Sequence, residues 1–245
     1  MSPLHISMIG LLSGLVGAGL GGVIVVLLGK PKPRGLSYLM GFAAGVMVAI
    51  VLADLLPEAV ETGGFLPSIV GLAAGAAFTM MLDYVVPHIH ILEAEETDPR
   101  LVKAGLVLAL GIALHNLPEG IAIGTGYIAS PQMGFTLALL IGLHNIPEGV
   151  ALSAPLFSGG IKGWHVIAAA GLAGVPVGLG AYLGAVIGGL SDLLLSLGLG
   201  FAGGAMLYIA FHELLPEAHR AHQGRSSVMG IFTGVAVGLL LTSIL

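Results

Sequence analysis

The stretch LVKAGLVLALGIALHNLPEGIAIGTGYI at residues 101–128 decides the fold, because it is apolar over the length of a membrane-spanning helix and yet contains HNLPEG at residues 115–120. A helix needs about 20 apolar residues to cross the hydrocarbon layer of a bilayer. The next apolar run contains a near-copy of the motif, HNIPEG at residues 144–149. Ionisable groups inside a membrane are costly and usually mark an ion pathway. The repeated motif therefore predicts a functional site in the middle of the membrane.

The composition predicts an all-α polytopic membrane protein embedded in a lipid bilayer. Of the 245 residues, 56% are hydrophobic and 9% are charged, against about 25% charged in soluble domains. No stretch between the apolar runs is long enough to form a soluble core, so residues 1–245 are predicted to form a single transmembrane domain. Eight apolar runs separated by turn residues predict eight transmembrane helices, at about residues 5–28, 36–60, 65–87, 101–128, 132–156, 163–189, 193–219 and 226–245.

The basic residues predict how the chain is oriented in the cell membrane. Every Lys and Arg falls in, or at the edge of, a connection that the count of eight spans places on one side: Lys30, Lys32, Arg34, Arg100, Lys103, Lys162, Arg220 and Arg225. Because cytoplasmic connections accumulate Lys and Arg, this side is predicted to be cytoplasmic and both termini to be outside, extracellular or periplasmic. The N-terminal sequence MSPLHISMIG has no basic region before its apolar run, which predicts a retained first span and not a cleaved signal peptide.

The cysteine count and the net charge narrow the chemistry. Because the chain contains no Cys, disulfides, thiolate metal sites and Cys nucleophiles are excluded, which leaves His, Asp, Glu, Asn and Met as metal ligands. The net charge of -5, without a basic patch, argues against nucleic acid as a partner. The oligomeric state stays open, with a homodimer as one option.

The two motifs predict a binding site for a divalent metal ion. His115 and Glu119 are four residues apart and share one helix face, and Pro118 leaves a backbone carbonyl without its helical donor. His144 and Glu148 repeat this arrangement in the neighbouring antiparallel span. Histidine and carboxylate together suit a cation of borderline hardness, such as zinc, iron(II), manganese, cobalt or cadmium. The structural alternative is a kinked helix with a hydrogen-bonded polar cluster, and the matched second copy argues against it.

A second repeat, DLLPEA at residues 54–59 and ELLPEA at residues 213–218, lies in two spans that are predicted to run in opposite directions. It predicts an inverted repeat in which spans 1–3 match spans 6–8 around a central pair formed by spans 4 and 5. Such repeats are typical of transporters. Asp54 is then predicted at an outer station for a cation, and Asp83, His212 and Glu213 at an inner station.

Two further groups of potential ligands have two interpretations each. Met47 on the second span is a soft potential ligand, but a lone methionine in an apolar helix more often packs against its neighbours. The segment PHIHILEAEETDPR at residues 87–100 contains His88, His90 and four acidic residues, in a predicted cytoplasmic loop at about 88–100. This loop suits either weak metal collection or ordinary solvation of an acidic surface.

With these residues the sequence resembles the ZIP family of divalent metal transporters, particularly its GufA-like branch in bacteria and archaea. The resemblance rests on both HNxPEG motifs and on GFAAGVM at 41–47, LDYVVPHIH at 82–90 and HELLPEA at 212–218. It implies an eight-helix fold with both termini outside and import of metal into the cytoplasm by alternating access, with the metal as bound substrate and no cofactor. It also implies a central metal site, an inner exit route and a cytoplasmic metal-binding loop. The central site would consist of His115, Asn116, Glu119, His144, Asn145 and Glu148 with Met47 touching it, the exit route of Asp83, His212 and Glu213, and the loop site of His88 and His90.

The sequence departs from the family pattern at one position in span 6. The family often has a glutamate just before the proline of this span, where it binds a second metal ion. In this chain Val175 precedes Pro176, and the surrounding stretch GLAGVPVGLG contains no carboxylate. The resemblance therefore implies a predominantly mononuclear site.

The alternatives to transport differ in how well the residues fit them. HELLPEAH looks like the HExxH motif of metalloproteases, but Pro216 stands where that motif requires its second histidine. The chain is therefore not predicted to be an enzyme. A passive metal-cation channel and a non-transporting membrane metal sensor are both compatible with the same residues, and the sequence does not rank the metals.

Overall fold

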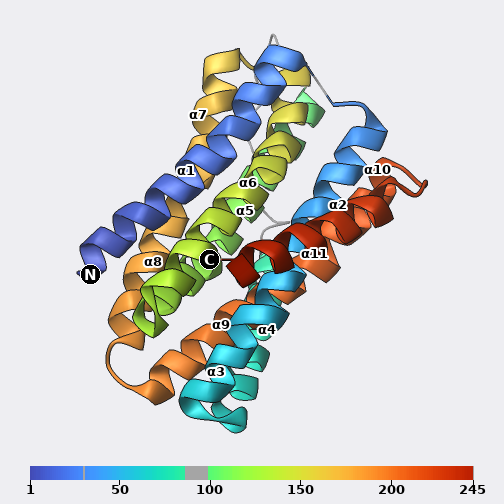
Figure 1. Ribbon diagram of the computed structural model, residues 1–245. Coiled ribbons are helices and arrows are strands. Elements are labelled where there is room, and N and C mark those ends of the chain that lie inside the picture. Colours follow the sequence, from blue (N-terminus) through green and yellow to red (C-terminus); the bar gives the residue numbers. More distant parts are fainter. Residues whose placement is uncertain (30, 86–98, 245) are drawn as a thin grey trace.

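The computed structural model of the protein describes residues 1–29, 31–85 and 99–244, without the side chains of residues 82–85, 99, 100, 104, 107, 115 and 244. All regular elements of this described part are helices (Figure 1). The α-helices are α1 (Pro3–Leu28), α2 (Pro33–Ile50), α3 (Leu56–Gly63), α4 (Phe65–Val85), α5 (Pro99–Ala129), α6 (Pro131–Ser158), α7 (Gly163–Ala173), α8 (Val175–Gly188), α9 (Asp192–Ile209), α10 (Leu215–Ala221) and α11 (Ser226–Ile244). Two π-helical segments, η1 (Val51–Leu55) and η3 (Ala210–Leu214), connect α2 to α3 and α9 to α10.

Seven helical segments of the described residues are long and apolar enough to cross a membrane. Three of them are composite: α2–η1–α3 (Pro33–Gly63), α7–α8 (Gly163–Gly188) and α9–η3–α10 (Asp192–Ala221). The apolar part of α4 is shorter, at Phe65–Met81. The prediction of an all-α, multi-pass membrane protein is confirmed, whereas eight crossings and external termini stay predictions.

Serine caps define several of the predicted turns. Ser130 alone separates α5 from α6, and its Oγ accepts a hydrogen bond from the Met133 N–H at 3.1 Å. Ser191 caps α9 in the same way, accepting from the Leu194 N–H at 3.2 Å. A serine cap satisfies a backbone donor that the first helical turn leaves free, and Pro131 directly after the first cap is preset for a helix start. Ser130 and Ser191 therefore lie where the sequence predicts turns, between the spans at 101–128 and 132–156 and between those at 163–189 and 193–219.

Four helix pairs pack backbone against backbone through glycine residues: α1 with α6, α5 with α8, α2 with α11 and α4 with α9. In the last pair, a Cβ added at Gly75 of α4 would overlap the carbonyl oxygen of Phe201 in α9. A Cβ added at Gly204 of α9 would overlap that of Leu72 in α4. Small residues allow such close approach in lipid, where apolar contact alone contributes little to helix association.

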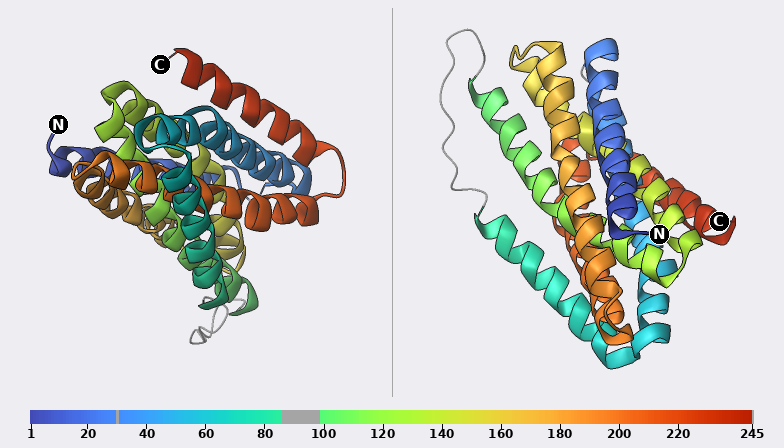
Figure 2. Two further views of the ribbon diagram at one scale, coloured as in Figure 1. Left: turned by 90° about the horizontal axis from the view of Figure 1, so that it is seen from below. Right: turned by 90° about the vertical axis from the view of Figure 1, so that its left-hand side faces the viewer.

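This packing agrees with the predicted inverted repeat. Suppose that α1 is exchanged with α7–α8, α2–η1–α3 with α9–η3–α10, α4 with α11, and α5 with α6. This exchange turns the pair α2–α11 into α9–α4 and the pair α1–α6 into α8–α5. Each glycine-lined pair is thus converted into another of the four, as an inverted repeat requires. In Figure 1, α2 and α9 run in opposite directions, and α11 lies alongside α2 in both Figures 1 and 2. The central pair of the repeat is α5 with α6.

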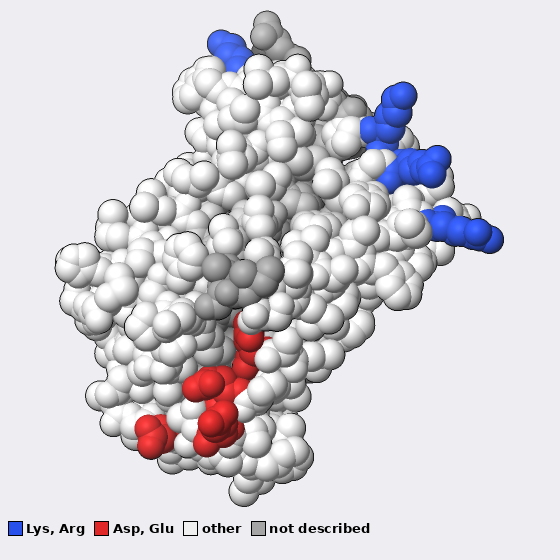
Figure 3. Space-filling model, viewed as in Figure 1, with Lys and Arg blue, Asp and Glu red and all other residues white. Residues whose placement is uncertain are grey.

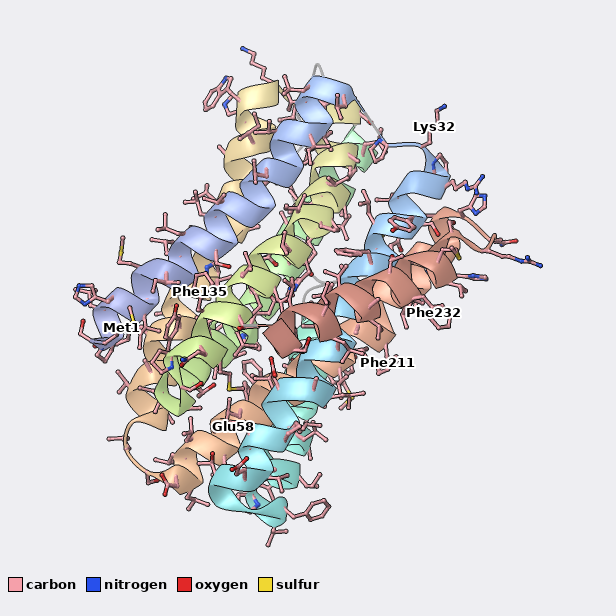
Figure 4. The ribbon with its side chains drawn as sticks, viewed as in Figure 1. Met1, Lys32, Glu58, Phe135, Phe211 and Phe232 are labelled. Carbon is pink, nitrogen blue, oxygen red and sulfur yellow. The ribbon has the colours of Figure 1, made fainter. Side chains whose placement is uncertain are left out.

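On the face of the bundle shown in Figure 3, basic and acidic side chains lie apart from each other. In the face shown in Figure 3, Lys and Arg lie at one end and Asp and Glu toward the other. Lys32, just before α2, marks the basic end, and Glu58 in α3 marks the acidic end (Figure 4). The gathering of basic side chains at one end agrees with the predicted one-sided connections. That this end is cytoplasmic stays a prediction.

Candidate metal centre

The central helices α5 and α6 bring polar residues of the two HNxPEG motifs together. Glu119 of α5 and His144 and Glu148 of α6 each offer one ligand atom, and these atoms all lie within 4.8 Å of one another. The three residues are buried, with no more than 1% of their surface exposed. Because His144 and Glu148 are four residues apart, they share the face of α6 that meets α5. The predicted meeting of the two motifs is thus observed for these three side chains.

Short polar contacts connect the cluster. His144 Nε2 lies 2.9 Å from Glu119 Oε1. The orientation of Asn145 that satisfies its amide places the nitrogen toward both carboxylates, where it donates to Glu119 Oε2 and Glu148 Oε2 at 3.3 Å each. Two carboxylates buried this close together repel each other and have lost most of their hydration, so a cation between them is strongly favoured. The cluster therefore places two carboxyl groups beside an imidazole in buried surroundings.

The dimensions of the cluster are close to those of a zinc site. Ligand atoms bound about 2.0–2.1 Å from a tetrahedral Zn²⁺ lie about 3.3 Å from one another. From the observed spread of 4.8 Å, the ligand atoms would approach one another by up to about 1.5 Å to reach this geometry. Imidazole nitrogen and carboxylate oxygen are both ordinary zinc ligands, and three of them leave a fourth position open.

Asn116 of α5 contacts a different helix with its amide nitrogen. Its Nδ2 donates to the carbonyl oxygen of Ala173, the last residue of α7, at 2.7 Å. The side chain is fully buried. Its Oδ1 accepts no hydrogen bond from any described residue. Nδ2 is thus engaged in a hydrogen bond, whereas Oδ1, the atom through which Asn116 would bind a metal ion, has no described hydrogen-bond partner.

The other described candidates lie outside this cluster. Met47 is fully buried in the main apolar core, as its packing interpretation predicts. Asp54 lies in η1 and is partly exposed. His212 and Glu213 lie in η3, His212 exposed and Glu213 partly buried. The ring of His212 stacks on Tyr208 with the two centroids 4.8 Å apart.

The side chains of four predicted site residues fall outside what the structure describes. The backbones of His115 and Asp83 belong to α5 and α4, but their side chains are not among the described ones. His88 and His90, with most of the predicted loop at 88–100, lie outside the described residues altogether. Their assignment to metal binding stays a prediction.

The two π-helical segments were not predicted from the sequence. η1 ends two residues before Pro57, and η3 ends two residues before Pro216. Each segment contains one candidate carboxylate, Asp54 or Glu213. A π turn widens the helix locally, and such turns are frequent at functional sites. The signal was present in the repeated LLPEA sequence, whose proline removes a helical donor at the same place in each half.

Most of the chain is similar to zinc transporters. Residues 90–242 match the family model described as ZIP zinc transporter. The zinc transporter ZupT of Xanthomonas axonopodis pv. citri (strain 306) is 32% identical over 244 residues, covering 91% of this chain and 89% of that protein. The zinc transporter GufA of Myxococcus xanthus is 36% identical over 173 residues, covering 70% of this chain and 68% of that protein. These matches confirm the resemblance seen in the sequence, and the chain belongs to the ZIP family, whose members are transporters and not enzymes.

Proposed function

We propose that the protein carries zinc across the cell membrane into the cytoplasm by alternating access. We further propose that it accepts other divalent transition metals, namely iron(II), manganese, cobalt and cadmium. The observation that carries the proposal is the buried cluster of Glu119, His144 and Glu148 between two membrane-spanning helices. The names of the similar zinc transporters support zinc as the substrate.

The proposed site replaces the water around the ion with protein ligands. The two carboxylates offset the double positive charge, which an apolar core would otherwise exclude. The imidazole of His144 contributes a borderline nitrogen ligand that suits zinc better than calcium or magnesium. Asn145 holds both carboxylates from one side before the ion enters. The open fourth position is assigned to one of the remaining candidates, His115, Asn116, Asn145 after rotation of its amide, or Met47.

The proposed path has a station at each end of the bundle. Asp54 in η1 receives the ion on the outer side, and Glu213 and His212 in η3, together with Asp83, accept it on the inner side. The inverted repeat supports alternating access, because two equivalent halves allow a central site to open toward either face. The end of the bundle that carries Lys and Arg is taken as cytoplasmic.

Zinc uptake into proteoliposomes is expected to saturate with zinc concentration and to show counterflow, because an alternating site carries a limited load in each cycle. Isotopic zinc should enter faster when the vesicles are preloaded with unlabelled zinc. Iron(II), manganese, cobalt and cadmium should compete with it. Vesicles without protein are the control. Uptake that rises linearly without counterflow would indicate a channel, and binding without flux would indicate a sensor.

Titration of the purified protein with Zn²⁺ is expected to show one tight equivalent per chain. Among the described residues there is one group of at least three His, Asp or Glu ligands, and Val175 occupies the span 6 position where the resemblance implies a further ligand. Val175→Glu is therefore expected to add a second equivalent. Two tight equivalents in the unaltered protein would contradict a mononuclear site.

A further inference from the structure

The break between α7 and α8 leaves one buried carbonyl without a helical donor. α7 ends at Ala173 and α8 begins at Val175, with Gly174 between them. Pro176 has no N–H to donate. The N–H of Val177 donates to Gly174 O at 3.2 Å and not to Ala173 O, its normal α-helical acceptor. Ala173 is only 4% exposed, so its carbonyl oxygen needs a donor from elsewhere in the protein.

Asn116 supplies this donor from α5. Its Nδ2 lies 2.7 Å from Ala173 O, and the side chain is fully buried. A buried carbonyl without a donor is costly, so this hydrogen bond contributes more than one at the surface would. α5 is also in backbone contact with α8, because a Cβ added at Gly120 of α5 would overlap Val177 O of α8. The amide of Asn116 thus connects α5 to the break in span 6.

The break is also in close contact with α1. A Cβ added at Gly174 would overlap the carbonyl oxygen of Gly14, and a Cβ added at Gly14 would overlap that of Gly174. α1 also packs closely on α6, where a Cβ added at Gly149 would overlap Ala18 O. The break therefore contacts both α1, which packs on α6, and α5, which carries Glu119.

We infer that Asn116 is a positioning residue that couples occupancy of the metal centre to the α7–α8 break. Its Nδ2 is committed to Ala173 O, whereas its Oδ1 accepts no hydrogen bond from any described residue. Asn116 itself precedes Glu119 by about one helical turn. A cation on Oδ1 withdraws electron density from the amide and strengthens the hydrogen bond that Nδ2 donates. This inference rests on the proposed function, which supplies the cation. Span 6 then senses the bound ion through Asn116, although Val175 offers it no ligand.

We call the hydrogen bond from Asn116 Nδ2 to Ala173 O the clasp. It is tested first without metal, in the full chain reconstituted in lipid nanodiscs. Asn116→Asp keeps the size of the side chain and an oxygen for the cation, but it removes the N–H donor and faces Ala173 O with a second acceptor. Amide hydrogen exchange in peptides covering residues 171–178 is expected to become at least about fivefold faster. Gln132→Glu makes the same amide-to-carboxylate change at an exposed residue of α6, outside the metal centre, and should leave exchange in these peptides unchanged. Unchanged exchange in Asn116→Asp would overturn the clasp.

The coupling is tested by adding Zn²⁺. The unaltered protein is expected to exchange more slowly over residues 171–178 when zinc is bound, whereas Asn116→Asp should bind zinc without this protection. In uptake measurements the variant should lose maximal rate more than apparent zinc affinity. Equal protection in both proteins, or a loss confined to affinity, would overturn the coupling. If the unaltered protein binds no zinc, the proposed function and the coupling fail, while the metal-free comparison still decides whether the clasp exists.

Discussion

Glu119→Ala is expected to reduce saturable zinc uptake into proteoliposomes by at least about 100-fold. Glu119 is fully buried, and its Oε1 lies 2.9 Å from Nε2 of His144. Removing a residue that merely orients a metal ligand typically costs about 10- to 100-fold in metal affinity or activity. Glu119→Ala removes a proposed ligand together with one of the two negative charges that offset the ion. Initial rates over a range of zinc concentrations, normalised to reconstituted protein, provide the measurement.

Two further variants support the interpretation of this result, one that removes only the charge of Glu119 and one that serves as a control. Glu119→Gln keeps the shape of the side chain but removes its charge, and it should lose uptake as well. Glu217→Ala is the matched control, because this carboxylate is 42% exposed and pairs with Arg220 at 3.1 Å within α10. Exposed pairs of this kind contribute little, so its uptake should be unchanged. Normal uptake by correctly folded Glu119→Ala would remove Glu119 from the metal centre.

Gly75→Ala is expected to destabilise the protein by about 3 kcal/mol or more, because the new methyl group meets backbone atoms that no side-chain rotation can move. The added Cβ would overlap Phe201 O and lie 2.7 Å from Phe201 C and 3.0 Å from Ala205 N. For a chain of this size, the loss corresponds to a melting temperature lower by roughly 6–12 °C. Thermal loss of the monodisperse peak in size-exclusion chromatography measures this change without a thiol dye, which a chain without Cys could not bind.

Gly19→Ala provides the matched control for this helix contact. Its added Cβ would meet Gly171 Cα at 3.9 Å, an ordinary van der Waals distance. Alanine also favours a helix over glycine by about 1 kcal/mol, so Gly19→Ala should melt at the same temperature or above it. Equal melting of Gly75→Ala and the unaltered protein would contradict the backbone contact between α4 and α9.

Local chemistry in the sequence was sufficient to predict most helices and the meeting of Glu119, His144 and Glu148 in the candidate metal centre. Turn residues placed the span at 132–156, and the structure has α6 at Pro131–Ser158. The i, i+4 spacing of His144 and Glu148, together with the short connection to α5, required the two motifs to meet. Glu119 joins them because it occupies the matching position of the first motif.

Other features depend on interactions that hydrophobic periodicity does not encode. A π turn differs from an α turn by a single residue, so the apolar pattern across η1 and η3 is almost unchanged. The span predicted at 163–189 divides into α7 and α8 at Gly174. Asn116 reaches this break across 57 residues of sequence. The hydrogen bond from the Asn116 amide to a carbonyl depends on this tertiary neighbour, which motif spacing alone does not reveal.

The two halves of the fold are nearly equivalent in structure but not in chemistry. η1 and η3 occupy equivalent places, so Asp54 stands where Glu213 stands, while Ala53 stands where His212 stands. A carboxylate is present at both ends, and an imidazole beside it at only one. If the two ends of the path bind the metal ion with unequal affinity, the rates at which the ion enters and leaves differ. By detailed balance, the final distribution of an uncoupled ion across the membrane does not change. The proposed carrier would therefore be reversible, and its direction would come from the gradients across the membrane, including about 4.6 kcal/mol for a doubly charged ion at 100 mV.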